Sequence, residues 1–565
     1  MNTLIAPYGG EMQSLLRDCS RAENLKREAQ AYASLTLSWQ QLCELELLLT
    51  GALSPLQGYM DRADMEGVLS RLRMADGLFW PRPVVLAIDE QAVRGIEPGT
   101  RLALRDAEGF LCAILNVTER WQADPEREIA LAQESGFPLS EALSRAGQIY
   151  LAGRLDGVAL PPHHDFLALR LNPAETRTLF SKRGWRRVMG MMPSQPLHRM
   201  HLDFFKQIPR QQGVNLMIQV AGGADPVHDA SHFSRVRACQ AIQPRFPATV
   251  APLFSLSPLP SLREGDREVL YKAIIARNHG CSHLVVGGEW IPSGEQRRGV
   301  DMAAEGSPLH TLTRERLGVE LIPFPRLVYA EERDAFVPEE EVADTHALRR
   351  MSGAELYRRL VRGEDVPEWY TFPEVIDELS KAYPPRSGQG FTVFFTGLSG
   401  AGKSTLARGL AIKLMELGGR RVTLLDGDVV RRHLSSELGF SRAHRDINIR
   451  RIGYVASEIT KHGGVAICAP IAPYQFTRRD VRAMVSPWGG FIEVYVATSL
   501  EVCEGRDRKG LYAKARAGLL PEFTGVSDPY EVPEQAELVI DTAQCGVEEA
   551  MAQILAKLED EGYLA

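Results

Sequence analysis

The chain has 565 residues, of which 44% are hydrophobic and 24% charged. These fractions are ordinary for globular proteins, and at roughly 100–200 residues per domain the length predicts three or four domains. Lys and Arg number 65 against 72 Asp and Glu, a formal net charge of −7, so no overall positive charge favours nucleic acid or acidic lipid as a partner.

Membrane and disulfide-rich classes are also excluded by pattern. No apolar run reaches the roughly 18–20 residues of a membrane span, and the first residues show neither a basic region nor an apolar core of a secretion signal. The eight cysteines are scattered without a CxxC pair, which argues against a disulfide framework and a structural zinc site. We therefore expect a cytoplasmic protein with buried or incidental thiols.

The first 160 residues mix short apolar runs with turn residues. We expect a short helix that ends at Gly51 and strands over 80–89, 100–109 and 110–120. From about Phe166 the pattern changes to strands that alternate with helices, which predicts a parallel sheet with βαβ crossovers. The strands expected there are 186–194, 215–223, 248–256 and 283–288.

A charged helical stretch is expected from about Glu331 to Leu379, followed by a linker rich in Pro, Gly and Ser over 379–391. A second α/β unit follows, and its first helix is expected over 405–418, where apolar residues recur at helical spacing. Its expected strands are 391–397, 421–428, 463–470, 491–498 and 537–542.

The most specific motif is GLSGAGKST, residues 397–405, which follows an apolar strand and precedes an amphipathic helix as a phosphate-binding loop requires. Glycines let the backbone N–H groups turn toward phosphate oxygens, and the helix N-terminus adds partial positive charge. Lys403 is expected to reach the β- and γ-phosphates and the Ser404 hydroxyl to hold Mg²⁺. The loop residues expected to bind ATP are Gly397, Ser399, Gly400, Ala401, Gly402, Lys403, Ser404 and Thr405.

Asp426 and Asp428 follow the second strand of this unit, where carboxylates lie close enough to the loop to position Mg²⁺ or to take a proton from an attacking hydroxyl. A pair of solvated strand-end aspartates is the alternative. Arginines cluster downstream, and they are either a solvated basic helix face or forks for phosphate or sulfate oxygens. This cluster comprises Arg431, Arg445, Arg450 and Arg451.

The motifs GLSGAGKST, DGDVVRRHL, LGFSRAHRDINIRR, RDRKGLYAKARAG and EFTGVSDPYE stand in the order and spacing of adenylyl-sulfate kinases, which residues 390–564 closely resemble. The resemblance implies transfer of a phosphoryl group from ATP to the 3′-hydroxyl of adenylyl sulfate (APS), giving 3′-phosphoadenylyl sulfate (PAPS) and ADP. Asp426, with Ser404, would hold Mg²⁺, and Asp428 and Lys403 would complete the catalytic set.

The same resemblance assigns the acceptor and lid residues. Phe440 and Phe523 would sandwich the adenine of adenylyl sulfate, while Arg506 would pack on the adenine of ATP. Lys509 would belong to a lid that closes over both substrates and excludes water. The residues expected to bind adenylyl sulfate are Arg431, Phe440, Arg445, Asn448, Ile471, Lys509 and Phe523.

One position departs from many bacterial members of the kinase family. Those members have Ser-Pro after the third strand, with a serine that can be phosphorylated, and here the pair is Ala472-Pro473. Because residue 472 has no hydroxyl, a phosphoserine intermediate at this position is impossible. Direct in-line transfer is the mechanism that remains.

The first 380 residues resemble ATP sulfurylase (sulfate adenylyltransferase), through ELELLLTGALSPLQGYM, WPRPVVL, PLHRMH, LIPFPRLVY and MSGAELYRRLVRGEDVPEWYTFPEVIDEL in order. The resemblance implies a multidomain α/β fold. Its expected parts are a PUA-like β-rich N-terminal domain (1–165), a Rossmann-like nucleotidyltransferase α/β domain (166–330), a small helical subdomain with linker (331–385), and the P-loop kinase α/β domain with a parallel sheet (386–565).

The sulfurylase motifs are degenerate. The family's Q-x-R-N-P-x-H-x-x-H is here MPSQPLHRMH, so that Met192, Ser194 and Gln195 replace the Gln, Arg and Asn, while His198 and His201 remain. Sulfate is a doubly charged oxyanion that needs bidentate donors, so the loss of the arginine is severe. The two histidines are a relic nucleotide contact or have a helix-surface role, because no third ligand for a metal stands at a recognisable spacing.

Two further sulfurylase motifs have lost polar groups. G-R-D-H-x-G is here Gly287-Gly288-Glu289-Trp290-Ile291-Pro292, without its Arg, Asp and His, and Pro325 stands where the family has Arg in P-F-R. The apolar scaffold persists around these sites. We therefore expect a retained fold whose sulfurylase site has decayed.

The function expected is that of an adenylyl-sulfate kinase with Mg²⁺ as cofactor, fused to an inactive sulfurylase-like half that is scaffolding or regulatory. The alternative is a bifunctional enzyme that also makes adenylyl sulfate and pyrophosphate from ATP and sulfate. ATP and adenylyl sulfate are the expected partners, with no nucleic acid and no membrane. The family's fused members assemble, so a homo-oligomer, dimer or hexamer, is expected.

Overall fold

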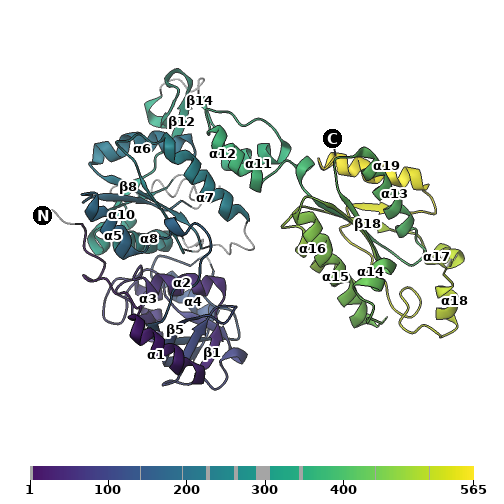
Figure 1. The fold of residues 1–565 in the computed structure, drawn as a ribbon, viewed down its shortest axis with the longest axis horizontal. Helices are drawn as coiled ribbons and strands as arrows, with labels where there is room; N and C mark the ends of the chain where they lie inside the picture. Colours follow the sequence, from purple (N-terminus) through teal and green to yellow (C-terminus); the bar gives the residue numbers. More distant parts are fainter. Residues whose placement is uncertain are drawn as a thin grey trace. The chain divides into compact units, whose positions relative to one another are not determined.

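The computed structural model forms two compact units, Met1–Gly353 with Val366–Ala382 and Ala354–Asp365 with Tyr383–Ala565 (Figure 1). The residues that the structure describes are 4–139, 141–193, 195–223, 230–259, 265–287, 306–342, 348–439, 441–507 and 509–564.

The N-terminal part of the first unit is built on a six-stranded mixed sheet in the order β1-β4-β5-β6-β2, with β3 also paired to β6. Only the β1–β4 pair is parallel. Its elements are α1 (Cys19–Glu28), β1 (Ala33–Thr36), α2 (Trp39–Leu49), β2 (Gly58–Tyr59), α3 (Arg62–Arg71), β3 (Leu86–Asp89), β4 (Arg101–Arg105), β5 (Leu111–Gln122), α4 (Pro125–Glu134) and β6 (Gln148–Gly157).

The middle part is a parallel five-stranded sheet in the order β11-β10-β7-β8-β9. The chain reverses its direction of crossover at β7, and ligands of open α/β sheets bind at such a point. Its elements are α5 (Pro173–Lys182), β7 (Val188–Met191), α6 (Arg199–Gln212), β8 (Asn215–Ala221), α7 (Ala230–Ile242), β9 (Leu253–Ser257), α8 (Asp266–His279), β10 (His283–Val286), α10 (Pro308–Leu312) and β11 (Glu320–Pro323).

A buried arginine on α8 joins the N-terminal and middle parts into one body. Arg267 is 0% exposed and donates to the carbonyl oxygens of Leu69 and Pro81, both at 2.7 Å, to Phe137 O, and to Ser135 Oγ at 2.9 Å. A single hydrophobic core also runs through both parts. The two parts therefore share their stability.

Several sequence expectations for this unit need correction. The strand expected over 80–89 begins only at Leu86, because Pro81 and Pro83 have no N–H to give to a sheet. The stretch expected to be helical from Glu331 is partly a three-stranded antiparallel sheet in the order β13-β12-β14, in which Asp334 has φ +45° and turns the chain. The elements here are β12 (Leu327–Ala330), β13 (Ala335–Pro338), β14 (Leu348–Arg349) and α12 (Pro373–Ala382), while α11 (Gly353–Arg362) belongs almost entirely to the second unit.

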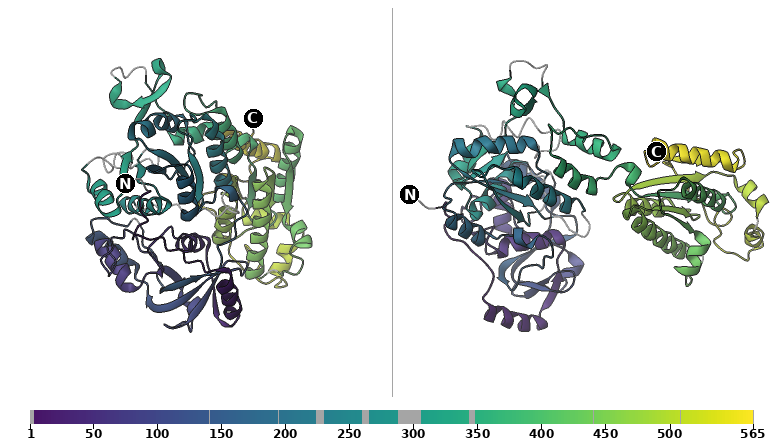
Figure 2. Two further views of the ribbon diagram at one scale, coloured as in Figure 1. Left: turned by 60° about the vertical axis from the view of Figure 1, so that its left-hand side comes forward. Right: turned by 45° about the horizontal axis from the view of Figure 1, so that its top comes forward.

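The second unit is a parallel five-stranded sheet in the order β16-β17-β15-β18-β19 between two helix layers (Figures 1 and 2). Helices α13 and α19 pack on one face, and α15 and α16 on the other. Its elements are β15 (Phe391–Thr396), α13 (Lys403–Leu417), β16 (Val422–Asp426), α14 (Gly427–His433), α15 (Arg442–Lys461), β17 (Val465–Ala469), α16 (Gln475–Val485), β18 (Gly490–Val496), α17 (Leu500–Arg506), α18 (Leu511–Arg516), β19 (Leu538–Ile540) and α19 (Val547–Asp560).

All five predicted strands of this unit are present, and β15 lies at its centre, where crossovers leave in both directions. The phosphate loop therefore sits at the switch point of the sheet. Among the described helices, none is both long and apolar enough to cross a membrane.

Candidate active site

The loop between β15 and α13 has the backbone that its glycines predict. Gly397 has φ +145° and Gly402 has φ +109°, which residues with a side chain rarely adopt. A Cβ at Gly397 would lie 2.6 Å from the carbonyl oxygen of Val496 on β18. The loop thus needs glycine for close packing as well as for its turn.

Lys403, the first residue of α13, is buried beneath this loop. Its Nζ donates to the carbonyl oxygens of Gly397 at 2.9 Å and Leu398 at 2.6 Å. Burial lowers the pKa of Lys403 to about 8. The ammonium group is therefore held inside the loop, where phosphate oxygens would compete with these two carbonyls for it.

A threonine after β19 supports the loop, and sequence reasoning did not identify it. Thr542 Oγ1 donates to Ala401 O at 2.8 Å and lies 2.9 Å from Thr498 Oγ1. Arg506 donates from Nη1 to Thr542 Oγ1 at 2.7 Å and from Nη2 to Thr542 O at 3.0 Å, and its Nη1 is 3.4 Å from Gly400 O. The residue expected at the ATP adenine therefore lies beside the phosphate loop.

Tyr512 on α18 makes a second contact with the loop that the motif alone did not indicate. Its hydroxyl donates to Ser399 O at 2.9 Å, and its ring meets that of Phe523 edge-on at 5.1 Å. The predicted lid segment and one predicted acceptor residue are therefore linked to the phosphate loop through one buried tyrosine.

The two predicted catalytic aspartates occupy the β16–α14 junction. The Asp426 carboxylate caps α14 by accepting from Asp428 N at 3.0 Å. The Asp428 carboxylate pairs with Lys509, and both side chains are more than half exposed. The candidate base and the candidate lid lysine are therefore in direct contact.

The donor set suits Mg²⁺, because a hydroxyl and a carboxylate are hard oxygen ligands. In the described parts of the chain, no group of three or more His, Cys, Asp and Glu could hold a metal. Ser404 and Asp426 would therefore supply two ligands at most. Phosphate and water oxygens would complete the octahedral shell that Mg²⁺ prefers.

Arg445 on α15 lies in a polar cluster with two other predicted substrate-loop segments. It donates to Thr524 Oγ1 at 2.6 Å, to the Tyr474 hydroxyl at 2.9 Å and to Asp528 Oδ2 at 2.9 Å. Burial and the hydrogen bond to Asp528 raise the pKa of Tyr474 to about 12. The cluster is therefore a neutral phenol between a cation and an anion.

Two buried polar atoms on α15 have no hydrogen-bond partner among the described residues, Arg445 Nε and Asn448 Oδ1. Unsatisfied buried polar atoms are costly, and they mark places where a ligand or water is accommodated. Both residues were predicted to bind adenylyl sulfate, and they lie one helical turn apart.

The remaining predicted acceptor residues are distributed around this cluster. Arg431 donates to Gly439 O at 3.0 Å, and burial lowers its pKa. Ile471 O accepts from Gly397 N at 3.3 Å, which joins the loop after β17 to the phosphate loop. Phe440 lies outside the described residues.

The sulfurylase-like motif follows β7, at the switch point of the first parallel sheet. His198 and His201 are 2% and 4% exposed, so the expected alternative of a helix-surface role is wrong. His201 Nδ1 accepts from His198 N at 3.0 Å, and His198 Nδ1 lies 3.1 Å from Thr371 Oγ1. Burial lowers the pKa of His198 to about 3 and of His201 to about 4.

Aromatic rings complete the surroundings of these histidines. The His198 ring lies 4.9 Å from that of Tyr370, and the His201 ring 5.3 Å from that of Phe324. Met192 is buried and Gln195 is exposed. Ser194, Gly288, Glu289 and Trp290 lie outside the described residues.

Comparison with curated proteins identifies the family. The chain is 40% identical over 568 residues to the sulfate adenylyltransferase of Phaeosphaeria nodorum, covering 99% of each chain, and 40% identical over 569 residues to that of Aspergillus terreus, with the same coverage. The chain belongs to the sulfate adenylyltransferase family. Family models divide this member into a PUA-like domain (5–160), an ATP-sulfurylase (168–382) and an adenylylsulphate kinase (389–541).

A solved structure matches the whole of this family member. It is described as a hexameric APS kinase from Thiobacillus denitrificans, with 46% sequence identity, a TM-score of 0.83 and coverage of 100% of both chains. The family models confirm the expected fusion of a sulfurylase part with a C-terminal kinase part.

Proposed function

We propose that the kinase half transfers the γ-phosphoryl group of ATP to the 3′-hydroxyl of adenylyl sulfate, giving ADP and PAPS, and that the sulfurylase-like half does not adenylate sulfate. The observation that carries the kinase proposal is that three groups lie at the same edge of the second unit's sheet. These are the phosphate loop with its buried Lys403, the Asp428 carboxylate, and the Arg445–Asn448 face with its unsatisfied polar atoms.

The proposed reaction assigns each group one task. Phosphates of ATP replace the two loop carbonyls on Lys403, whose charge then stabilises the transferring phosphoryl group. Asp428 takes the proton of the acceptor hydroxyl as that oxygen attacks in line, and its pairing with Lys509 is exchanged for substrate contacts when the lid closes. Because residue 472 is alanine, no enzyme-bound phosphoserine forms there.

Magnesium is the proposed cofactor, held by Ser404 and Asp426. When bound, it neutralises charge on the β- and γ-phosphates. The proton step is assigned to Asp428, since Asp426 caps α14 through one oxygen and is assigned to the metal.

The state of the histidine pair supports the loss of sulfurylase activity. A transition state of adenylyl transfer gathers negative charge that cations or hydrogen-bond donors stabilise. His198 and His201 are buried and neutral at physiological pH, and the Nδ1 atom of each ring already has a hydrogen-bond partner. With the family's Arg replaced by Ser194, the motif offers no cation for sulfate.

The bifunctional alternative is favoured by one observation, the names of the relatives that match the full length. It requires both steps in one chain, with adenylyl sulfate made in the first half and consumed in the second. Sulfate-dependent release of pyrophosphate from ATP distinguishes it from our proposal.

The kinase proposal is tested by product analysis with the full-length protein. ATP, Mg²⁺ and adenylyl sulfate should yield ADP and PAPS in equal amounts, and omission of adenylyl sulfate should abolish most ADP formation. ADP formed without PAPS would show hydrolysis instead of transfer, and no turnover at all would refute the kinase assignment.

The proposal also includes the oligomeric state and the cellular location of the protein. We expect a homo-oligomer, and the full-length structural relative is described as hexameric. We expect the protein to act in the cytoplasm, where both nucleotides are available.

A further inference from the structure

Residue 472 has a strained backbone in the kinase half. Ala472 is fully buried and has φ +47°, a left-handed conformation that residues other than glycine rarely adopt. Such a residue persists only where its surroundings hold it in place. The neighbouring residue, Ile471, is one of those predicted to bind adenylyl sulfate.

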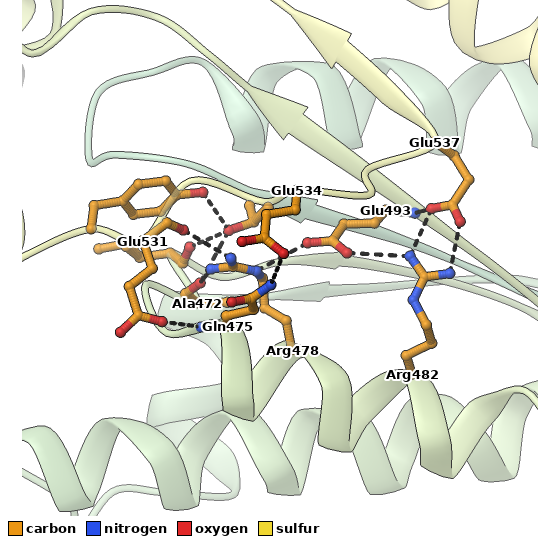
Figure 3. A network of polar contacts seen from close by, with 11 residues as sticks. Ala472, Gln475, Arg478, Arg482, Glu493, Glu531, Glu534 and Glu537 are labelled. Carbon is orange, nitrogen blue, oxygen red and sulfur yellow. Dashed lines mark hydrogen bonds and ion pairs between the residues drawn. The ribbon is translucent and has the colours of Figure 1, made fainter.

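A buried arginine on α16 holds this strained segment (Figure 3). Arg478 Nη1 donates to Ala472 O at 2.8 Å, and Nη2 donates to Glu531 O at 2.8 Å. Its Nε lies 3.0 Å from Glu493 Oε1 on β18, an ion pair without the direction of a good hydrogen bond. The side chain of Arg478 is only 2% exposed, and each of its three guanidinium nitrogens contacts one of these partners.

The two carbonyl groups that Arg478 joins belong to different walls of the predicted acceptor site. Ala472 lies in the loop after β17, and Glu531 ends the segment that begins near Phe523. Glu531 N donates to Pro473 O at 2.9 Å, and its carboxylate accepts from Gln475 N at 2.6 Å. These contacts keep the two walls side by side.

The same arrangement reaches the phosphate loop. Thr396, the last residue of β15, has its Oγ1 2.8 Å from Ile471 O and 2.8 Å from the Tyr530 hydroxyl. Gly397 N also donates to Ile471 O. The loop after β17 is thus fixed against the first residue of the phosphate loop on one side and against Arg478 on the other.

Arg482, one turn further along α16, provides an internal comparison (Figure 3). It contacts Glu493 at 3.2 Å and forms two bonds to Glu537 at 2.7 and 2.8 Å. Arg482 therefore shares a carboxylate with Arg478 but contacts side chains, not the carbonyl groups of the acceptor walls.

We propose that Arg478 is a positioning residue for the acceptor, which holds Ala472 in its left-handed conformation and thereby sets the distance between the Ile471 and Phe523 walls. It does not touch either substrate. The inference rests on the proposed function, because it concerns the site where adenylyl sulfate would bind. A lysine cannot replace Arg478, since a single ammonium group cannot serve two carbonyls and a carboxylate in fixed directions.

The test measures the affinity of the full-length protein for adenylyl sulfate, with ADP present, and for ADP alone, by calorimetry. Arg478→Lys should weaken the binding of adenylyl sulfate about tenfold or more, because a small misplacement of binding groups is costly. Its affinity for ADP should stay within about twofold of the wild-type value. Arg482→Lys, the matched control, should change both affinities by less than about twofold. All variants are measured below their unfolding temperatures.

A rescue separates positioning from a merely structural role. Glycine adopts positive φ without strain, so Ala472→Gly in the Arg478→Lys background should restore affinity for adenylyl sulfate to within about threefold of wild type. If Arg478→Lys does not fold, Thr396→Val provides a second test, because it removes the hydroxyl between Ile471 and Tyr530. This variant should weaken the binding of adenylyl sulfate and leave the binding of ADP unchanged.

The outcomes are distinct. The positioning role would be overturned by an equal loss of affinity for both ligands, by unchanged binding of adenylyl sulfate, or by absence of rescue by Ala472→Gly. Turnover by the wild-type protein would still support the kinase assignment in each of these cases. A wild-type protein that neither binds nor phosphorylates adenylyl sulfate would overturn both.

Discussion

At Lys403, burial and function make opposite demands on one ammonium group. The protein interior favours the neutral amine and lowers the pKa to about 8, whereas phosphate binding needs the cation. The two loop carbonyls that accept from Nζ hold the charged form in the meantime. Lys403 therefore loses its proton only above about pH 8, where a bound anion would restore it.

Nucleotide binding should consequently take up protons above pH 8. The pKa of free Lys403 is depressed, so the group loses its charge as pH rises through about 8, and bound phosphates raise the pKa again. We expect uptake of about half a proton or more per ADP bound at pH 8.5 and clearly less at pH 7. Calorimetry in two buffers of different ionisation enthalpy measures this number, and equal uptake at both values would contradict the account.

Asp428 should be needed for chemistry and dispensable for binding. Asp428→Asn keeps the shape of the side chain but removes the proton acceptor, so kcat should fall about 10²-fold or more while the affinity for ADP changes by less than about threefold. Asp480→Asn is the control, since Asp480 is an aspartate of α16 that pairs with Arg450. A normal kcat in Asp428→Asn would assign the proton to another group.

Among the helices and strands, the sequence predicts those that a local pattern of residues determines. All five kinase strands were predicted because strands of a parallel sheet covered on both faces are continuous apolar runs. The phosphate loop and Asp426 were predicted because a strand end and a motif coincide. Contacts between distant segments had no such signal, so the contacts of Thr542, Tyr512 and Arg478 could be found only in the structure.

The same limit explains the errors in the first half. The antiparallel sheet of β12, β13 and β14 consists of strands of four residues or fewer, too short for periodicity to separate them from a charged helix. The burial of His198 could not be predicted either, because it depends on the ring of Tyr370 far along the chain.

Substitution of Arg267 tests whether this residue holds the N-terminal and middle parts of the first unit together. Arg267→Met removes the donor from the buried carbonyl groups of Leu69 and Pro81, so the unfolding free energy of the first unit should fall by about 3 kcal/mol or more. Arg183→Met, an exposed arginine of the same unit, should change it by less than about 0.5 kcal/mol. Denaturant unfolding followed by tryptophan fluorescence measures both, and equal effects would contradict the joining role of Arg267.

In the molecule as a whole, the net charge is −7, but the cationic side chains at the two candidate sites are unevenly distributed. In the kinase unit, Lys403 and Arg506 contact the phosphate loop, and Arg445 lies in the cluster with Tyr474 and Asp528. The sulfurylase-like motif has serine at the position expected for arginine, and its two histidines are buried. This distribution agrees with the proposal that the kinase half, and not the sulfurylase-like half, acts on anionic substrates.

The kinase unit should work without the first unit. A chain that begins at Pro384 lacks the first unit and the Ala354–Asp365 segment of the second, but it keeps the Arg386–Glu561 ion pair at 2.8 Å and the complete five-stranded sheet. We expect its kcat/KM for adenylyl sulfate to lie within about threefold of the full-length protein, and a smaller assembly in solution if the first unit is the scaffold. Loss of activity in a folded fragment would instead indicate that the first unit regulates the kinase.

The most direct test of the whole account is a single comparison in the full-length protein. PAPS formation from ATP and adenylyl sulfate, and pyrophosphate release from ATP and sulfate, are measured on the same preparation with Mg²⁺. We expect steady PAPS formation and no sulfate-dependent pyrophosphate release. Sulfate-dependent pyrophosphate release at a rate comparable to PAPS formation would contradict the account and establish the bifunctional alternative.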